Sequence, residues 1–202
     1  FVQDLFERHP GRQAQADARL GAGIVGYADM MLGAGVEAVL SAHLQAGGGR
    51  FKGIRYATAL DPHPEIRVHH RTAPGAMRER AFEEALRVVG RMGLSFDAFV
   101  FFHQLPEVER LARRHPDLNL VLQHCGGLLG YGPWAGRRDE VLALWKRNLR
   151  AVAACPNVTV KLGGILGRLA AYDYLHTERP EPSERLAQAL RPYILHCIEA
   201  FG

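Results

Sequence analysis

Apolar residues follow two alternating patterns along this chain. Short runs that are almost continuously apolar lie at residues 22–29, 50–56, 96–102, 118–124 and 158–162. The segments between and after them carry apolar residues three and four positions apart, at 35–45, 76–92, 106–115, 139–154 and from 183 onward. The first pattern is typical of strands buried on both faces, and the second of one face of a helix. The sequence therefore predicts five strands that alternate with helices.

Proline and serine mark some of the expected boundaries. Pro106 is expected in the first turn of its helix, and His115-Pro116 is expected to end that helix. Ser183 is the expected cap of the last helix. A short polar helix is expected at 13–20, and the aperiodic stretch 61–74, rich in Pro, His and Arg, is expected to form a long loop.

Strand and helix alternation predicts right-handed βαβ units and a parallel sheet, hence an α/β fold. No shift in composition marks a boundary, so residues 1–202 are expected to form a single domain. A five-stranded open sheet and part of an eight-stranded (β/α)8 barrel are both compatible with the pattern. A complete barrel usually needs roughly 250 residues.

Polar side chains follow three of the expected strands. His103 and Gln104 follow one, His124 follows the next, and Lys161 lies within the last. In parallel α/β folds the chemistry gathers at the carboxyl ends of the strands, so these four side chains are the first candidates for a shared site. His103 and Gln104 are neighbours, and strand alternation would turn only one of them toward the site. The other would face the helices or open the next helix.

His124 is the leading candidate for catalysis. The small residues Cys125-Gly126-Gly127 follow it, so the backbone can pass close to a ligand. A neutral imidazole at this position can bind a metal, polarise a carbonyl group or relay a proton. The alternative is a structural histidine bonded to a neighbouring backbone carbonyl.

Two cations are candidates for binding an anionic group of a substrate. Lysine occurs only at positions 52, 146 and 161, so Lys161 inside an apolar run is expected to have a carboxylate partner or a task. Arg55 ends another expected strand, and its guanidinium can offer a fork to a carboxylate or phosphate. A structural ion pair is the alternative for both residues.

Composition narrows the class of protein. The formal net charge is +4, but Lys and Arg are spread along the chain without interleaved aromatic residues, so no nucleic-acid partner is expected. Three widely spaced cysteines argue against a disulfide framework and favour a reducing, cytoplasmic location. The apolar runs are too short to span a membrane, and residue 1 begins no signal sequence. A small molecule is the expected partner.

Several short motifs together carry a resemblance to a known family. They are Ala22-Gly23-Ile24-Val25-Gly26-Tyr27-Ala28-Asp29, Gly49-Arg50-Phe51-Lys52-Gly53-Ile54-Arg55, Gly93-Leu94-Ser95-Phe96-Asp97, Gln123-His124-Cys125-Gly126-Gly127, and Val160-Lys161-Leu162-Gly163-Gly164. In this order they resemble the amidohydrolase-related (amidohydrolase 2) TIM-barrel hydrolases, in the branch that includes sugar-acid and dicarboxylate lactonases. The resemblance covers nearly the whole chain.

The resemblance implies a hydrolase that opens a lactone with water activated by an Asp at a barrel end, with or without a divalent metal such as zinc. It assigns His124 to metal binding or to polarising the scissile carbonyl, and Arg55 and Gln104 to the substrate. Lys161 and His103 join them as expected substrate-binding residues. His103 departs by one position from the family's usual histidine, because the sequence here is Phe101-Phe102-His103-Gln104.

The family's His-x-His pair on the first strand and its Asp on the last strand have no counterpart in these residues. We therefore expect the chain to be the middle of such an enzyme, strands three to seven of a partial (β/α)8 barrel, and an isolated arc of this kind to expose strand edges. A non-catalytic binding module of the same fold and a decarboxylase remain alternatives. A homo-oligomer is compatible with the sequence.

Overall fold

The computed structural model describes residues 21–68, 72–165 and 182–202. Its centre is a parallel sheet whose strands follow one another in space in the same order as in the sequence. The strands are β1 (Ile24–Gly26), β2 (Phe51–Ala57), β3 (Ser95–Phe99), β4 (Leu120–Leu122) and β5 (Val158–Val160). This confirms the expected α/β alternation, while the helix expected at 13–20 lies outside the described residues.

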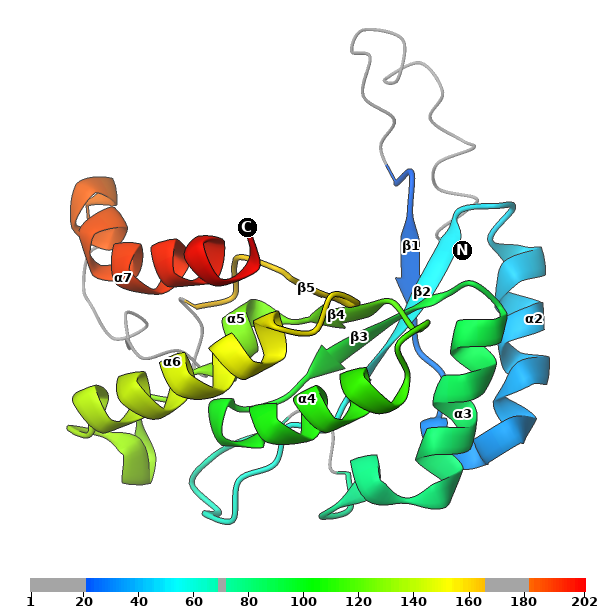
Figure 1. Cartoon of the computed structure of the whole chain (residues 1–202), viewed down its shortest axis with the longest axis horizontal. Coiled ribbons are helices and arrows are strands. Elements are labelled where there is room, and N and C mark those ends of the chain that lie inside the picture. Colours follow the sequence, from blue (N-terminus) through cyan, green and yellow to red (C-terminus); the bar gives the residue numbers. More distant parts are fainter. Residues whose placement is uncertain (1–20, 69–71, 166–181) are drawn as a thin grey trace, which may run out of the picture.

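Helices connect successive strands and pack along one face of the sheet (Figure 1). The longer ones are α2 (Val36–Ala46), α3 (Arg80–Arg91), α4 (Leu105–Arg114), α6 (Arg138–Ala153) and α7 (Ser183–Phe201). Short helical turns join them: η2 (Met30–Gly35), η3 (Ala76–Arg78), η4 (Phe102–Gln104), α5 (His124–Gly127) and η5 (Gly132–Trp134). The chain returns to the same end of the sheet after α2, α3, α4 and α6, as parallel strands require.

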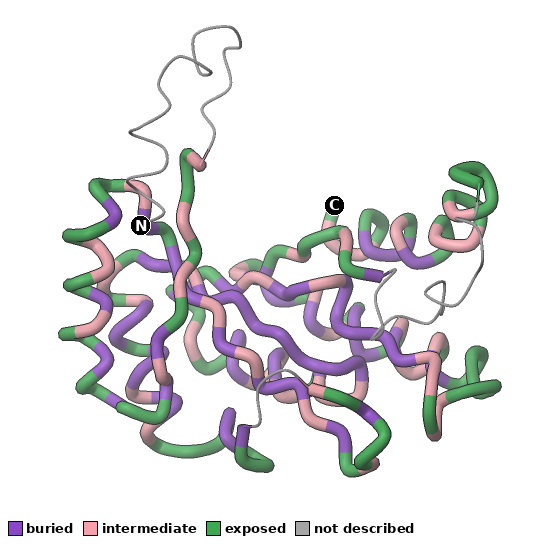
Figure 2. The backbone as a smooth tube through the Cα atoms, turned by 180° about the vertical axis from the view of Figure 1, so that it is seen from behind, coloured by how far each residue is buried: buried purple, intermediate pink, exposed green. Residues whose placement is uncertain are grey.

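The strand register divides the sheet residues between two faces. Ile54, Phe96, Leu120 and Val158 stand side by side on neighbouring strands, and all four are buried toward the helices. The next row consists of Arg55, Asp97, Val121 and Thr159. Because successive side chains of a strand point to opposite faces, this second row lines the face away from the helices. One face therefore forms the apolar core seen as the buried centre of Figure 2, and the other carries charges.

Helix α6 is fixed to the end of β4 by a buried tryptophan. The Trp145 indole is fully buried, and its Nε1 donates a hydrogen bond to the backbone oxygen of Cys125 at 2.7 Å. Burying a side chain of this size contributes on the order of 2–3 kcal/mol through apolar area alone. The same hydrogen bond gives a partner to the Cys125 carbonyl group, which lies in a sharp turn outside the sheet.

Four of the strands, β1, β3, β4 and β5, end before their apolar runs do. β3 ends at Phe99, and Phe102–Gln104 form the turn η4, so the expected strand alternation between His103 and Gln104 is wrong. β4 ends at Leu122, because His124 and Cys125 have φ angles of 51° and 54°, which an extended strand does not allow. The expected cap at Ser183 is also wrong, since Pro182 occupies the cap position and Ser183 begins α7.

Candidate active site

Arg55 and His124 meet over one aromatic ring at the carboxyl end of the sheet. The Arg55 Cζ atom lies 4.9 Å from the centre of the Phe99 ring, and the His124 ring lies edge-on to it with centres 5.5 Å apart. Phe99 is the last residue of β3 and is buried, so it forms a rigid floor. The structure thus brings together two of the residues expected from the sequence.

Glycines make room for the His124 ring. A Cβ atom on Gly164 would lie 2.1 Å from His124 Nδ1, so only glycine allows the loop after β5 to pass this close. A Cβ atom on Gly127 would lie 1.9 Å from the backbone oxygen of Val100. His124 itself has a left-handed backbone, which costs on the order of 1 kcal/mol or more in a non-glycine residue. The position of the imidazole therefore depends on two close contacts, one between the loop after β5 and His124, and one between Gly127 and the backbone of Val100.

His124 is held in its neutral form. Burial lowers the pKa of its imidazole, and the positive charges of Arg55 and Lys161 lower it further. A hydrogen bond with the Gly163 backbone acts in the opposite direction but does not reverse the shift. At pH 7 the ring therefore has one N–H, which can polarise a carbonyl group, and one lone pair, which binding a metal requires.

Lys161 has a carboxylate partner, which is one of the two expectations for it from the sequence. Its Nζ donates to Asp97 Oδ2 at 2.5 Å, and Gln123 Nε2 donates to the same oxygen at 2.5 Å. Asp97 is buried, whereas the Lys161 side chain is about half exposed, at 49 %. Asp97 Oδ1 is shielded from solvent and has no hydrogen-bond partner among the described residues. The ammonium group is thus fixed at the exposed side of a buried carboxylate.

Asp97 was not a candidate from the sequence. It stands inside an apolar run, between Phe96 and Ala98, which face the helices. A single charge at an alternating position of a buried strand was the available signal, because it indicates that the opposite face of the strand is polar. Arg55, Phe99, His124 and Lys161, supported by Asp97, are called the mouth cluster below.

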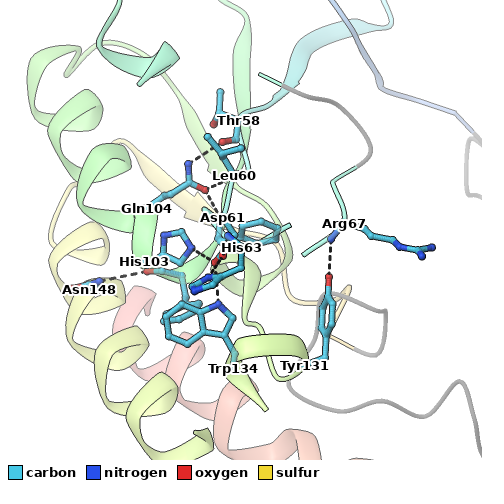
Figure 3. A network of polar contacts seen from close by, with 12 residues as sticks. Thr58, Leu60, Asp61, His63, Arg67, His103, Gln104, Tyr131, Trp134 and Asn148 are labelled. Carbon is cyan, nitrogen blue, oxygen red and sulfur yellow. Dashed lines mark hydrogen bonds and ion pairs between the residues drawn. The ribbon is translucent and has the colours of Figure 1, made fainter. Parts of the chain in front are cut away.

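His103 belongs to a different group of side chains, shown in Figure 3. Its Nε2 bonds to Asp61 Oδ2 at 3.0 Å, and the Trp134 indole donates to the same oxygen at 2.9 Å. His63 Nδ1 and the His63 backbone N–H bond to Asp61 Oδ1 at 2.7 and 3.0 Å. Asp61, His63, His103 and Trp134 form the loop cluster, which joins the loops after β2, β3 and β4.

The charge of the loop cluster resides on Asp61. Burial opposes ionisation of Asp61, but the His63 backbone and the side chains of Trp134, His63 and His103 outweigh it and hold the pKa of the carboxyl below its ordinary value. Burial lowers the pKa of His103, although Asp61 favours its protonated form. The cluster is therefore an ionised carboxylate with donors on both oxygens.

Gln104 holds the backbone of two loops together. Its Oε1 accepts hydrogen bonds from the N–H groups of Leu60 and Phe101 at 3.0 and 3.1 Å, and its Nε2 donates to the Thr58 carbonyl at 2.9 Å. These bonds fix the loop after β2 against the start of α4 (Figure 3). The use of Gln104 and His103 in substrate binding stays a prediction.

The described residues do not contain a metal site of their own. Within 21–68, 72–165 and 182–202, no group of three or more His, Cys, Asp or Glu side chains is arranged to hold a metal ion. His124 would be a single ligand, and a catalytic zinc ion usually needs three protein ligands. A metal would therefore need further ligands from other residues.

Comparison with known proteins decides the family. The sequence model described as "Amidohydrolase" matches residues 2–202. The chain belongs to the amidohydrolase family. An uncharacterized protein of Sinorhizobium fredii is 27 % identical over 181 residues, covering 89 % of this chain and 52 % of that protein. An L-fucono-1,5-lactonase of Burkholderia multivorans is 37 % identical over 92 residues, covering 42 % of this chain and 30 % of the lactonase.

Solved structures of the family share the fold. An amidohydrolase from Burkholderia multivorans with bound HEPES has a TM-score of 0.66 at 25 % identity, covering 97 % of this chain and 60 % of that one. A crystal form with bound zinc has a TM-score of 0.63 at 26 % identity, covering 92 % and 56 %. The expected partial (β/α)8 barrel is thus confirmed.

This amidohydrolase chain spans about half the length of the first curated relative and less than a third of the lactonase. None of its described helices combines the length and the apolarity needed to cross a lipid bilayer. The boundaries of the domain and the cytoplasmic location stay predictions.

Buried histidines predict an acid-sensitive fold. Burial lowers the pKa of His103, His115, His124 and His196. The unfolded chain, whose histidines titrate near 6.5, then binds more protons than the folded one just below that pH. We expect the free energy of unfolding to be fully present above about pH 6.5 and to fall as pH decreases toward 5.5.

Urea unfolding at pH 8, 7, 6 and 5.5 would measure this dependence. The pKa of the carboxyl groups of Asp61, Glu83 and Glu140 lies below their ordinary values of 3.8 for Asp and 4.5 for Glu, so these groups contribute little in this range. A His103→Asn variant should show a weaker pH dependence. Constant or rising stability between pH 7 and 5.5 would contradict the expectation.

Proposed function

We propose that the complete protein is a hydrolase that opens a lactone ring of the sugar-acid or dicarboxylate type. The observation that carries the proposal is the mouth cluster, in which a neutral imidazole stands beside two cations at the carboxyl end of a parallel sheet. Family membership and the partial likeness to a lactonase support the reaction class. In (β/α)8 enzymes this end of the barrel carries the chemistry.

His124 is the proposed electrophilic residue. Hydroxide attack on a lactone carbonyl places negative charge on the carbonyl oxygen, and a donor fixed in advance at that position lowers the barrier. The neutral His124 imidazole has one N–H, which can donate to this oxygen once it is released from the Gly163 backbone. Its seat between Phe99 and Gly164 limits its rotation, which favours one substrate orientation.

Arg55 and Lys161 are the proposed binding cations. The Arg55 guanidinium lies over the Phe99 ring, which leaves its edge available for a bidentate bond to a carboxylate. Asp97, which also accepts a hydrogen bond from Gln123, holds the Lys161 ammonium from the buried side, so the remaining N–H groups of Lys161 can meet a second oxygen. Asp97 is thus a positioning residue for Lys161.

The loop cluster and Gln104 are proposed to shape the mouth. Asp61, His103 and Trp134 bind three loops to one another, and Gln104 fixes the loop that carries Asp61. Water is activated, in this proposal, by the aspartate that the family resemblance assigns to the last barrel strand. A divalent metal such as zinc, if the complete protein uses one, would have His124 as its ligand from this chain.

Arg55→Met tests the binding role within this proposal. We expect the variant to raise KM for a carboxylated lactone by about tenfold or more, since a charge-assisted hydrogen bond contributes roughly 1.5–3 kcal/mol. Its effect on a neutral sugar lactone should be small. The measurement is initial rates for a panel of carboxylated and neutral lactones, followed by acid release with a pH indicator.

Lys52→Met is the matched control, because Lys52 lies on the same strand at its other end and its Nζ bonds only to the Gly49 backbone oxygen among the described residues. No hydrolysis of any lactone by the complete protein would exclude the proposed reaction. Equal KM increases in the two variants would exclude the role of Arg55 alone.

A further inference from the structure

Two of the three cysteines lie in contact next to the mouth cluster. Cys125 follows His124 in the turn after β4, and Cys197 stands on the buried face of α7. Their thiols are hydrogen-bonded to each other, although the two residues lie far apart in the sequence. Both side chains are fully buried and both thiols are free. Cys125 and Cys197 are called the thiol pair below.

The third cysteine shows the ordinary arrangement of a buried thiol. Cys155, between α6 and β5, contacts the backbone oxygen of Ala151 one turn earlier in the chain at 3.8 Å. A cysteine of this kind behaves as a small apolar residue. The thiol pair differs from it, because two sulfur atoms meet between α5 and α7, which pack against each other. Two thiols in contact are the reactants from which a disulfide forms.

The turn that holds Cys125 and His124 is fixed from three sides. The Cys125 N–H and the Cys125 thiol both donate to the Lys161 backbone oxygen, at 3.1 and 3.7 Å. The Cys125 carbonyl accepts the hydrogen bond of Trp145 on α6, and the Cys125 thiol meets Cys197 on α7. A change at the thiol pair is therefore transmitted to the backbone that positions the imidazole.

The loop after β5 contacts the Cys125 thiol and gives it a route to solvent. The Gly163 backbone bonds both to this thiol and to the His124 ring. Leu162 and Gly164, on either side of Gly163, are exposed. Local opening of an exposed loop costs far less free energy than global unfolding. Hydrogen peroxide is little larger than a water molecule, so movement of this loop admits it to the thiol pair.

We propose that a peroxide oxidises Cys125 and Cys197 to a reversible disulfide, and that this bond switches off the site at His124. One thiol, in its ionised form, attacks hydrogen peroxide, breaks the O–O bond and becomes a sulfenic acid, with hydroxide as the leaving group. The second sulfur then attacks the sulfenic sulfur and forms the S–S bond. Two thiols and one peroxide thus give one disulfide and two molecules of water. In the reducing compartment expected from the sequence, thiol exchange restores the pair.

The disulfide is expected to displace the His124 ring. An S–S bond is about 2.05 Å long, which is much shorter than a hydrogen bond between two sulfur atoms. Its formation draws Cys125 toward α7 and removes the thiol donor from the Lys161 backbone oxygen. The ring tolerates little movement, since a Cβ atom on Gly164 would already lie 2.1 Å from His124 Nδ1. A small misplacement of a positioned group is enough to lower the rate strongly.

The switching part rests on the proposed lactone hydrolysis, whereas formation of the disulfide does not. Treatment of the complete protein with millimolar hydrogen peroxide tests both parts. After the remaining thiols are blocked with iodoacetamide, mass spectrometry of an unreduced digest should show the Cys125 and Cys197 peptides joined, with the loss of two hydrogen atoms. We expect kcat/KM for lactone hydrolysis to fall at least fivefold, and dithiothreitol to restore it.

Cys155→Ala is the matched control, because it removes a buried thiol outside the thiol pair. It should form the joined peptide and lose activity as the unaltered protein does. Cys197→Ser and Cys197→Ala should form no joined peptide and keep their own starting activity under peroxide. Serine preserves a hydrogen-bond donor on α7 and alanine preserves its apolar surface, so the two variants together separate the loss of the thiol from a disturbance of packing.

Absence of the joined peptide in the oxidised protein would overturn the proposal, whatever the activity. A joined peptide with unchanged kcat/KM would overturn the switching role, and so would equal sensitivity to peroxide in the Cys197 variants. Failure of the reduced protein to hydrolyse any lactone would overturn the proposed function and with it the switch. The joined peptide would still establish the disulfide in that case.

Discussion

Replacing His124 with alanine is expected to lower kcat/KM for lactone hydrolysis by about 10²–10⁴-fold, the range typical of a positioned acid or base catalyst. The reason is geometric: the imidazole stands over Phe99 between Arg55 and the loop at Gly163-Gly164, and no other described histidine shares this position. If the imidazole stabilises the transition state only, kcat and kcat/KM fall together while KM changes little.

Steady-state kinetics of the complete protein measure this effect, and thermal unfolding shows whether the variant still folds. Gly164→Ala provides a companion test, because its Cβ atom would occupy the place of His124 Nδ1 while leaving the histidine in the sequence. It should lose activity through displacement of the ring. A His124→Ala enzyme with full activity would exclude the proposed role.

Gly127→Ala is expected to lower the free energy of unfolding by about 3–5 kcal/mol, which places it among the most damaging single substitutions. Two costs combine at this residue. Its φ angle is 62°, which disfavours any residue with a Cβ atom, and that atom would lie 1.9 Å from the Val100 carbonyl oxygen. The obstacle is backbone, so no side-chain rotation relieves it.

Gly136→Ala separates the two costs. Gly136 has a similar φ angle of 73°, but nothing lies within 4 Å of the Cβ atom that would be added. Only the backbone strain remains there, on the order of 1–2 kcal/mol. Urea unfolding of both variants measures the difference. Equal losses of stability would show that the close approach of Gly127 to Val100 is not maintained in solution.

The apolar pattern predicted the sheet because a strand buried on both faces accepts few residues that are not apolar. It predicted the longer helices because their buried face needs apolar residues three and four positions apart. Every strand overlaps its apolar run, and the bounds of α4 lie within one residue of those that Pro106 and His115-Pro116 predicted. Errors arose where backbone geometry changes within an apolar run. The left-handed residue His124 and the turn η4 are set by contacts with other loops, and such contacts leave no trace in hydrophobic periodicity.

Part of the candidate site was foreseeable for the same reason. His124, Arg55 and Lys161 follow or end apolar runs, and the structure brings them to one end of the sheet. The partners of these residues were not foreseeable from the pattern. The bond from Lys161 to Asp97 passes over β4 to reach β3, and the bond from Trp134 to Asp61 joins loops 73 residues apart in sequence. Pairings over such distances need the folded arrangement.

The hydrogen bond from Trp145 on α6 to the Cys125 carbonyl after β4 allows the candidate site to be followed by tryptophan fluorescence. The chain contains two tryptophans, and each indole N–H is committed to a different loop: Trp145 to the Cys125 carbonyl beside His124, and Trp134 to the Asp61 carboxylate. Indole emission responds to the dipoles and the water around the ring. The emission of Trp145 therefore reports on the backbone next to the His124 imidazole, and the emission of Trp134 reports on the loop cluster.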